Sequence, residues 1–151
     1  MHLEHLDHRD IDVAAAIVAV QQAAYPLEAE LIGFDRIPPL IETSDDIAAL
    51  DLVIIGSIDT SGEMLGLVGY QRVDDLVDID RLAVLPQCGG RGIATTLLTE
   101  VHEREHDAPI FEVSTGAANA PAIGLYRKLG YRRTGSFEIP DGPTMLTLRR
   151  G

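Results

Sequence analysis

The sequence lacks several features that would place it in a class at once. Its 151 residues contain no tryptophan and a single cysteine, Cys88. One cysteine cannot form an internal disulfide, which excludes a disulfide-stapled module and fits a reducing compartment. No apolar run reaches the ~18 residues that a membrane span needs, and the first ten residues lack the basic-then-apolar order of a secretory signal. We therefore expect a single cytoplasmic domain over residues 1–151 with no membrane partner.

Basic residues are also scarce. Twelve Lys and Arg stand against 24 Asp and Glu, which gives a formal net charge of -12. Proteins that bind nucleic acid cluster Lys and Arg to neutralise phosphates, so this charge argues against a nucleic-acid partner. A negative field favours cationic small molecules or basic partners, although a high net charge also serves plain solubility.

The first third of the chain alternates helical patterns with a long connection. Residues 9–24 carry apolar side chains at helical spacing and predict a helix that breaks at Pro26. Residues 25–44 mix acidic, aromatic and proline residues and predict a long, partly helical connection. Ser44 is the expected N-cap of a short helix over residues 44–50. The apolar stripe of the first helix is expected to contain Ile11, Val13, Ala14, Ile17, Val20 and Ala24.

The rest of the chain predicts a sheet with two further helices. Three strand-like runs separated by short turns predict an antiparallel meander, and a helical pattern after Gly90 then leads into another strand. Asn119 and Gly130 are the expected caps of the next helix, and a closing hairpin follows. The whole predicts an α+β fold with a mixed sheet. The expected strands, besides one at the N-terminus, are residues 52–58, 63–73, 76–84, 109–115, 131–139 and 144–150.

The main chemical signal is a glycine-rich loop between a strand and a helix, in AVLPQCGGRGIATTLL over residues 83–98. Glycines allow close approach of the backbone to an anion, and the first amides of a helix have no internal partner. The loop therefore predicts a phosphate site. It is no P-loop, because no lysine follows Gly92. A dinucleotide fingerprint is also a mismatch, because Thr95 stands where Gly or Ala is required.

Two motifs resemble those of the GNAT superfamily of N-acetyltransferases, which use acetyl-coenzyme A (acetyl-CoA). The first motif of the family reads Val-x-Pro-x-x-(Arg/Gln)-Gly-x-Gly-Ile-(Gly/Ala). This chain departs from it at Gly89, where Arg or Gln is usual. The segment NAPAIGLYRKLGY, residues 119–131, resembles the second motif of the family, with Tyr131 in place of Phe. The resemblance covers residues 52–138. The residues that match the first motif are Val84, Pro86, Gly90, Gly92, Ile93 and Ala94.

This resemblance implies a fold and a cofactor site. The fold is a GNAT-like, mostly antiparallel twisted sheet flanked by helices, with a splay between the fourth and fifth strands. Pantetheine would lie in the splay against the main chain of Leu82, Ala83 and Val84, and a backbone N–H there would polarise the thioester carbonyl. The resemblance also places the pyrophosphate on the amides of residues 89–95 and the cofactor arm beside Asn119. The expected loop residues are Gly89, Gly90, Arg91, Gly92, Ile93, Ala94 and Thr95.

The resemblance also implies roles in catalysis. Tyr126 matches the family tyrosine that donates a proton to the departing sulfur. Asp78 falls where some members carry a catalytic carboxylate, and Asp80 shares its face because the two lie two residues apart on one strand. Both carboxylates equally fit a solvent-facing role, and deprotonation through water needs neither. For the acceptor, we expect a site that includes Tyr25, Glu28 and Asp80.

A competing motif is HEREH over residues 102–106, which matches the His-Glu-x-x-His zinc pattern. Neither a third histidine nor a suitably spaced helical Glu follows it, and Pro109 ends the helix soon after. The N-terminal histidines His2, His5 and His8 would not converge along a strand. We therefore expect no metal site.

The sequence thus predicts an acetyl-CoA-dependent N-acetyltransferase. Transfer to a primary amine, of a small molecule or a peptide, would be direct in a ternary complex, because no nucleophile is placed for a covalent intermediate. A homodimer is compatible with the resemblance. The alternative is a non-catalytic acyl-CoA-binding regulatory module with the same fold.

Overall fold

The computed structural model describes residues 1–151. A seven-stranded sheet with the order β1-β2-β3-β4-β5-β7-β6 forms its centre. The strands are β1 (His2–His5), β2 (Val53–Ile58), β3 (Met64–Val73), β4 (Leu76–Val84), β5 (Ile110–Gly116), β6 (Arg132–Glu138) and β7 (Thr144–Arg150). The helices are α1 (Ile11–Ile32), α2 (Pro38–Ile41), α3 (Ser44–Ala48), α4 (Ile93–Arg104) and α5 (Ala120–Lys128).

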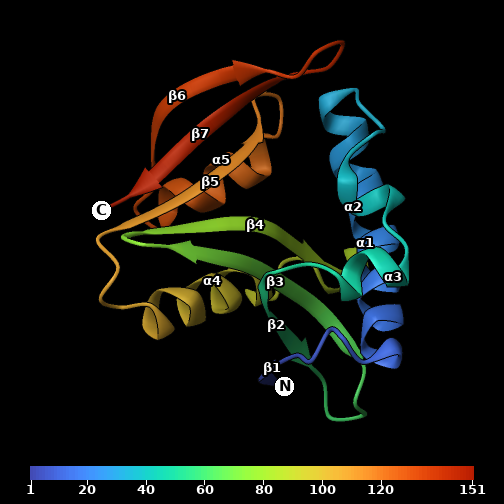
Figure 1. Ribbon diagram of the computed structural model, residues 1–151. Coiled ribbons are helices and arrows are strands. Elements are labelled where there is room, and N and C mark those ends of the chain that lie inside the picture. Colours follow the sequence, from blue (N-terminus) through green and yellow to red (C-terminus); the bar gives the residue numbers. More distant parts are fainter.

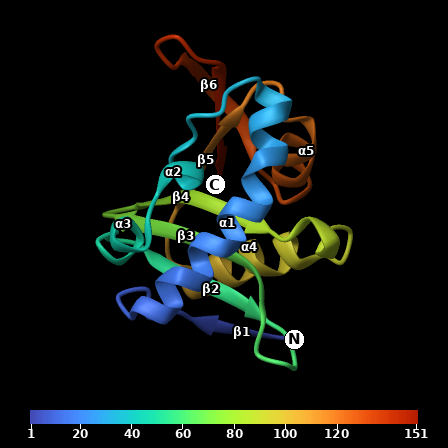
Figure 2. The same ribbon diagram turned by 90° about the vertical axis from the view of Figure 1, so that its right-hand side faces the viewer.

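Helices cover both faces of the sheet. Figures 1 and 2 show α1, α2 and α3 on one face of the β2–β4 region and α4 on the other. The buried apolar side chains of all these elements form one continuous core. Neighbouring strands are antiparallel except for β4 and β5. The α+β class and the mostly antiparallel sheet are therefore confirmed. None of the helices combines the length and apolar composition needed to cross a bilayer.

The parallel contact between β4 and β5 is short. Their pairing runs from Leu76↔Ile110 to Ile79↔Val113 and stops there, although β4 continues to Val84. A bulge lies at the same place, because Gly69 pairs with Arg81 while the next residue of β3 pairs with Ile79. Beyond it the two strands diverge, which confirms the predicted splay.

Helix α1 is longer than predicted, because it does not break at Pro26. It continues to Ile32 and ends at Gly33 in the left-handed conformation. A proline inside a helix costs about 3 kcal/mol, but the neighbouring Tyr25 is buried and its hydroxyl bonds to the Leu82 main chain. This tertiary anchor offsets the cost. The expected stripe is correct at Ala14, Ile17 and Val20 and wrong at Ile11, which is 70% exposed.

Two helix starts show how caps set the boundaries. The cap of α3 is Thr43 rather than Ser44, since Thr43 and Asp46 form a reciprocal capping box. The predicted cap Asn119 is confirmed, because its side chain accepts a hydrogen bond from the Ala122 N–H. Gly130 follows α5 with φ +91°, as its place after the helix predicts.

Candidate functional site

Three connected hollows run along β4 into the splay. The first, here called the loop cavity, has a volume of about 220 Å³ and surrounds the glycine loop. The second, the groove, has about 320 Å³ and runs between α1 and the start of α5 over β4. The third, the inner cavity, has about 310 Å³. The loop cavity and groove share Val84 and Leu125, and the groove and inner cavity share Tyr25, Glu28, Leu82, Asn119 and Ala122.

Free amides line the loop cavity. The first amide of α4 with a backbone partner belongs to Thr96, which donates to the Gly92 carbonyl. The amides of residues 90–95 precede it and have no backbone partner. Gly90 and Gly92 have φ near +78° and +77°, a region in which other residues are strained. The loop therefore presents successive N–H groups beside the positive end of a helix, an arrangement suited to phosphate.

Two predicted loop residues differ from expectation. Gly89 lines the loop cavity, but its N–H donates to the Pro86 carbonyl in the short 3-10 turn Pro86–Cys88, so that amide is already used. Arg91 is exposed and does not line the cavity. Ile93, Ala94 and Thr95 do line it, as does the buried thiol of Cys88.

The β4 edge of the groove is closed by a tyrosine. Leu82, Ala83 and Val84 line the groove as predicted. The Leu82 N–H donates to the Tyr25 hydroxyl over 3.1 Å, and the same hydroxyl donates to the Leu82 carbonyl over 3.1 Å. The N–H and carbonyl of Leu82 point into the splay, where β5 is no longer paired with β4. One side-chain hydroxyl therefore satisfies both groups.

Tyr126 reaches the inner cavity from α5. The residue is 5% exposed, and its ring packs edge-on against Tyr131 at 5.5 Å between centroids. The hydroxyl has no side-chain or backbone hydrogen-bond partner. Because its oxygen is not completely buried, the hydroxyl opens onto the cavity. Burial, with smaller effects of Tyr25 and Glu28, raises the pKa of Tyr126 well above its usual range.

Glu28 lies at the junction of the groove and the inner cavity. Desolvation raises the pKa of its carboxyl, and a hydrogen bond from the Asn119 side chain partly opposes this effect. Helix α1 therefore places a half-buried carboxylate in the hollow that Tyr126 also lines, and Asn119 bridges to it from the start of α5.

The structure separates the two aspartates of β4. Asp80 lines the inner cavity, but Asp78 does not. Residues of β4 still alternate in burial, so Asp78 and Asp80 share the less buried face of the strand, but Asp78 lies where β4 is still paired with β5. Asp78 instead lies opposite Glu112 of β5, and burial together with Asp80 and Glu112 raises the pKa of its carboxyl. Asp78 therefore does not line the inner cavity, and its catalytic role stays a prediction.

One wall of the inner cavity belongs to the 25–44 segment, which the sequence indicates for the acceptor site without singling out residues 37–39. Ile37, Pro38 and Pro39, at the start of α2, line it from the side opposite β5. Beneath them Arg81 is buried and paired with Glu42. The signal was present in the sequence, because Arg81 occupies an inward position of β4 between Ile79 and Ala83, where an isolated charge needs partners.

The HEREH segment does not place its histidines together. Helix α4 ends at Arg104, so His106 lies beyond it. His102 Nε2 lies 2.7 Å from the Tyr131 hydroxyl, and its ring packs edge-on against Phe111. Burial, with a smaller effect of Arg150, lowers the pKa of His102 to about 4. His102 is thus a neutral packing residue at pH 7, and no group of three potential ligands clusters anywhere in the chain.

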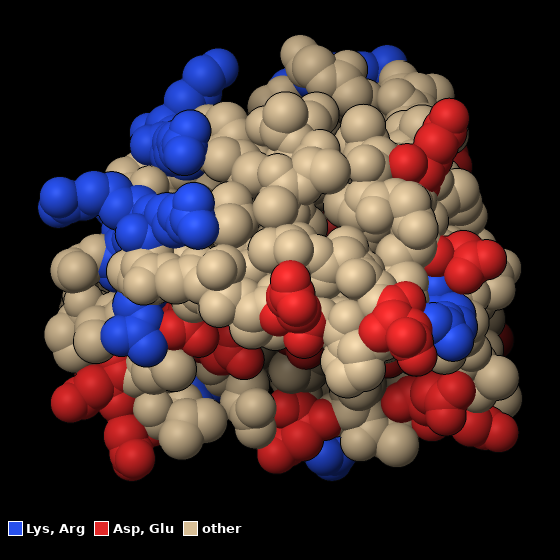
Figure 3. All heavy atoms as spheres, turned by 90° about the horizontal axis from the view of Figure 1, so that it is seen from above, with Lys and Arg blue, Asp and Glu red and all other residues tan.

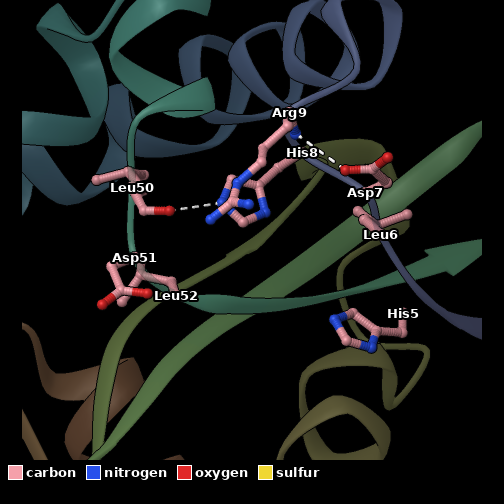
Figure 4. A pocket seen from close by; sticks show the side chains of 8 residues that line it. All are labelled: His5, Leu6, Asp7, His8, Arg9, Leu50, Asp51 and Leu52. Atoms are coloured by element: carbon pink, nitrogen blue, oxygen red, sulfur yellow. Dashed lines mark hydrogen bonds between the residues drawn. The ribbon is translucent and has the colours of Figure 1, made fainter.

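A further hollow of about 380 Å³ lies at the turn between β1 and α1, far from the glycine loop along the sheet. Figure 4 shows His8 pointing to the Leu50 carbonyl, to which its Nε2 bonds over 2.7 Å, while His5 lies apart from it. The backbone N–H of Arg9 donates to the Asp7 carboxylate. Of these two bonds, that of His8 joins the turn to residues 50–52, and that between Arg9 and Asp7 lies within the turn.

Charge is unevenly distributed over the surface. Figure 3 shows Lys and Arg gathered on the side where β6 and β7 lie, and Asp and Glu along the lower part and the opposite side of the view, around a largely uncharged centre. Arg127 and Lys128 of α5 and Arg132 and Arg133 of β6 are exposed and have no ion-pair partner. The net charge of -12 therefore understates how acidic the remainder of the molecule is.

Known proteins resemble both the sequence and the fold. The chain is 35% identical over 140 residues to "UPF0157 protein YqkA" of Bacillus subtilis (strain 168), an alignment that covers 93% of this chain and 40% of that protein. The chain thus spans less than half the length of this relative.

Two crystal structures share the fold at low sequence identity. The ribosomal-protein-S18-alanine N-acetyltransferase of Escherichia coli superimposes with a TM-score of 0.76 at 18% identity, over 99% of this chain and 92% of that one. The PaiA N-acetyltransferase of Thermoplasma acidophilum, in complex with coenzyme A, gives 0.76 at 16% identity over 99% of each chain.

The family assignment rests on the sequence itself. The profile described as "Acetyltransferase (GNAT) family" matches residues 16–131, which include the loop cavity, the groove and Tyr126. The predicted resemblance is confirmed, and the chain belongs to the GNAT family of acetyltransferases.

Proposed function

We propose that residues 1–151 form one acetyltransferase domain that binds acetyl-CoA along the three hollows and acetylates a primary amine by direct attack in a ternary complex. The observation that carries the proposal is the continuous path from the free amides of the glycine loop to the Tyr126 hydroxyl. It passes along a strand edge that the splay leaves without a partner strand.

The hollows suit the parts of this cofactor. The amides of residues 90–95 match a pyrophosphate, since no acidic side chain lines the loop cavity. The groove, lined mostly by apolar side chains, suits the pantetheine arm, which can pair with the main chain of β4. When bound, acetyl-CoA supplies an acetyl group activated as a thioester. The Leu82 N–H would polarise its carbonyl.

Tyr126 would hold the proton that the sulfur needs as it leaves. Its raised pKa keeps the hydroxyl protonated at neutral pH, and its lack of a protein partner leaves it free to donate. A buried donor of this kind is effective because it needs no reorganisation when negative charge develops on the sulfur.

Glu28 would accept the proton that the attacking amine loses. A primary amine must be neutral to attack, so a carboxylate next to it serves as a base. Glu28 suits this role because it lies where the groove meets the inner cavity. Desolvation raises its pKa toward that of a useful base. Asp80, at the cavity wall, would attract the amine as a cation before the proton is lost.

The charges of the inner cavity favour a cationic acceptor. Glu28 and Asp80 are its acidic residues, and the one cation, Arg81, is engaged by Glu42 and Asp80. An acceptor with a carboxylate next to the amine would find no free cation here. We therefore propose amines without an adjacent carboxylate, such as a peptide N-terminus or a polyamine. The name of the Escherichia coli neighbour supports the inclusion of a peptide that begins with alanine.

Two measurements test this function. Calorimetric titration with coenzyme A should show binding at one site per chain. Release of free thiol from acetyl-CoA should then be followed with a panel that contains an N-terminal alanine peptide, spermidine, an aminoglycoside and free alanine. Turnover with one of the first three supports the proposal. Binding with no turnover on any amine would instead support an acyl-CoA-binding regulatory module, and no binding would refute both.

A further inference from the structure

Arg81 is a buried cation in the middle of β4. Its side chain is 4% exposed, and every nitrogen of its guanidinium has a partner. Nε lies 2.7 Å from the Asp80 carboxylate. Nη1 and Nη2 donate to the two oxygens of Glu42 over 2.6 and 3.2 Å, and Nη1 also donates to the Gln21 amide oxygen over 3.0 Å.

The partners of Arg81 come from separate elements. Gln21 belongs to α1 and is fully buried, whereas Glu42 directly follows α2. The Gln21 amide nitrogen donates to the Pro39 carbonyl over 3.1 Å and to Glu42 over 3.3 Å. One guanidinium and one amide therefore join β4, α1 and α2 around a single point.

The fold makes room for this arrangement. Gly69 of β3 pairs with Arg81, and a Cβ there would lie 3.0 Å from Arg81 Cγ. A side chain at position 69 would therefore press on the stem of the arginine. A buried guanidinium is costly unless its donors are satisfied, so the network depends on all its members.

Helix α2 cannot hold its own position. It has four residues, and its N-cap, Ile37, makes no side-chain capping bond. So short a helix is not stable by itself. Its carbonyls at Pro38 and Ile37 accept from the amides of Glu42 and Leu40. Pro39 is buried and Leu40 packs against the core, and the polar links of this segment to the rest of the molecule pass through Gln21 and Glu42. The same helix provides the Pro38–Pro39 wall of the inner cavity.

We propose that Arg81 is the positioning residue of the acceptor site, fixing the Ile37–Pro39 wall through Glu42 and the Asp80 carboxylate through its Nε. This inference rests on the proposed function for its catalytic meaning, since the wall and Asp80 are what an acceptor would meet. Arg81 does not touch the reacting atoms. It sets the width of the cavity and the direction of its exposed carboxylate, and leaves the loop cavity unaffected.

The test compares Arg81→Met with Arg72→Met. Arg72 of β3 is a matched control because it also pairs with two carboxylates, Glu105 and Asp107, but lies outside the three hollows. Hydrogen exchange is measured at Leu40, Ile41 and Glu42, with α3 as an internal reference because its own capping box holds it. Steady-state kinetics use the best acceptor of the panel.

We expect exchange over residues 40–42 to become about tenfold faster in Arg81→Met, while α3 and the Arg72→Met protein stay as in the wild type. KM for the acceptor should rise about tenfold or more, with the Kd of coenzyme A within about twofold. Arg81→Lys should restore the exchange rate and KM only in part, because one ammonium cannot engage both carboxylates as the guanidinium does. Unchanged exchange in folded Arg81→Met overturns the proposal, as does an equal effect of Arg72→Met.

Two further arms keep the outcome decisive. If Arg81→Met does not fold, Glu42→Gln removes the charge while keeping the shape, and the same exchange and KM changes are expected on a smaller scale. If the wild type acetylates no amine, the proposed function fails, but exchange over residues 40–42 still decides whether Arg81 fixes the wall.

Discussion

The proposed cofactor side of this molecule, the loop cavity, and its proposed acceptor side, the inner cavity, are built in different ways. The loop cavity is made of backbone amides from one short stretch, residues 90–95. The proposed acceptor wall is held by side chains that lie far apart in the sequence: Glu42 and Arg81 are 39 positions apart, and Gln21 and Arg81 are 60 positions apart. A binding surface made of backbone depends on chain conformation, whereas one made of a side-chain network depends on residue identity.

This difference separates what substitutions should do. Substitutions in the glycine loop should affect cofactor binding mainly by changing the backbone conformation, as at Gly92 with its positive φ. Changes around the inner cavity matter through protons and charge, as at Tyr126 and Glu28. Each substitution below, apart from Tyr25→Phe, is paired with a control substitution that makes a similar chemical change outside the cavity concerned.

The largest effect is expected for Tyr126→Phe. Loss of the proton donor should lower kcat by about 10²-fold or more, because the sulfur would leave as an unprotonated thiolate. The Kd of coenzyme A should stay within about twofold. Tyr70→Phe is the control, since that hydroxyl bonds to Glu105 outside the site. A kcat of Tyr126→Phe close to that of the control would remove Tyr126 from the mechanism.

Glu28→Gln tests the proposed base, and Asp78→Asn is its control. Removing the base should lower kcat/KM by about 10- to 100-fold, and Asp78→Asn should change it little. Because the base must be ionised and its pKa is raised, wild-type kcat/KM should fall as the pH drops through a pKa above the usual Glu range. That acidic limb should vanish in Glu28→Gln. A limb that persists there, or vanishes in Asp78→Asn, would reverse the assignment.

Gly92→Ala tests the backbone side. Alanine at φ +77° costs about 1–2 kcal/mol, and relaxation of the loop would misdirect its amides, so the affinity for coenzyme A should fall about fivefold or more. Gly62→Ala carries the same strain at φ +89° in the turn between β2 and β3. Both variants should lose similar stability in chemical denaturation, but Gly62→Ala should bind coenzyme A normally. Equal binding by both would show that loop geometry is not what holds the cofactor.

The smallest effect is expected for Tyr25→Phe, and it has the opposite sign. The Tyr25 hydroxyl occupies the Leu82 N–H that the thioester would need. Phenylalanine leaves that N–H unpaired in the free protein, so binding should tighten by about two- to tenfold, which corresponds to one net hydrogen bond. Titration with acetyl-CoA measures it. Weaker binding would instead place the hydroxyl among the groups that hold the cofactor.

Local signals in the sequence predicted the cofactor side well. The seven strands, the glycine loop, the Asn119 cap and the splay lie where patterns of period two, capping residues and the family motifs place them. The strands, the loop and the cap depend on neighbours within one element or one turn, and such short-range preferences are legible in a single sequence. The splay lies between two strands distant in the sequence, and only the resemblance to the family implied it.

The acceptor side was less predictable because long-range contacts override local preference. Helix α1 passes Pro26 since Tyr25 is anchored on β4, 57 residues away. Asp78 and Asp80 differ because β5 pairs with β4 at Asp78 but no longer at Asp80, and no residue of β4 announces where this pairing ends. The Arg81 network joins three elements, and an inward arginine indicates that partners exist without saying which they are.

The short pairing of β4 with β5 leaves an open strand edge inside the protein. Unpaired edges of sheets invite association with any extended chain, and proteins usually block them. Here the block is a single phenol, the Tyr25 hydroxyl, which takes both hydrogen-bonding groups of Leu82. An edge that must stay available to a ligand cannot be sealed by another strand. A side-chain plug satisfies the hydrogen-bonding groups of Leu82 in the free protein, and by turning aside it would leave the edge available for a ligand to pair with.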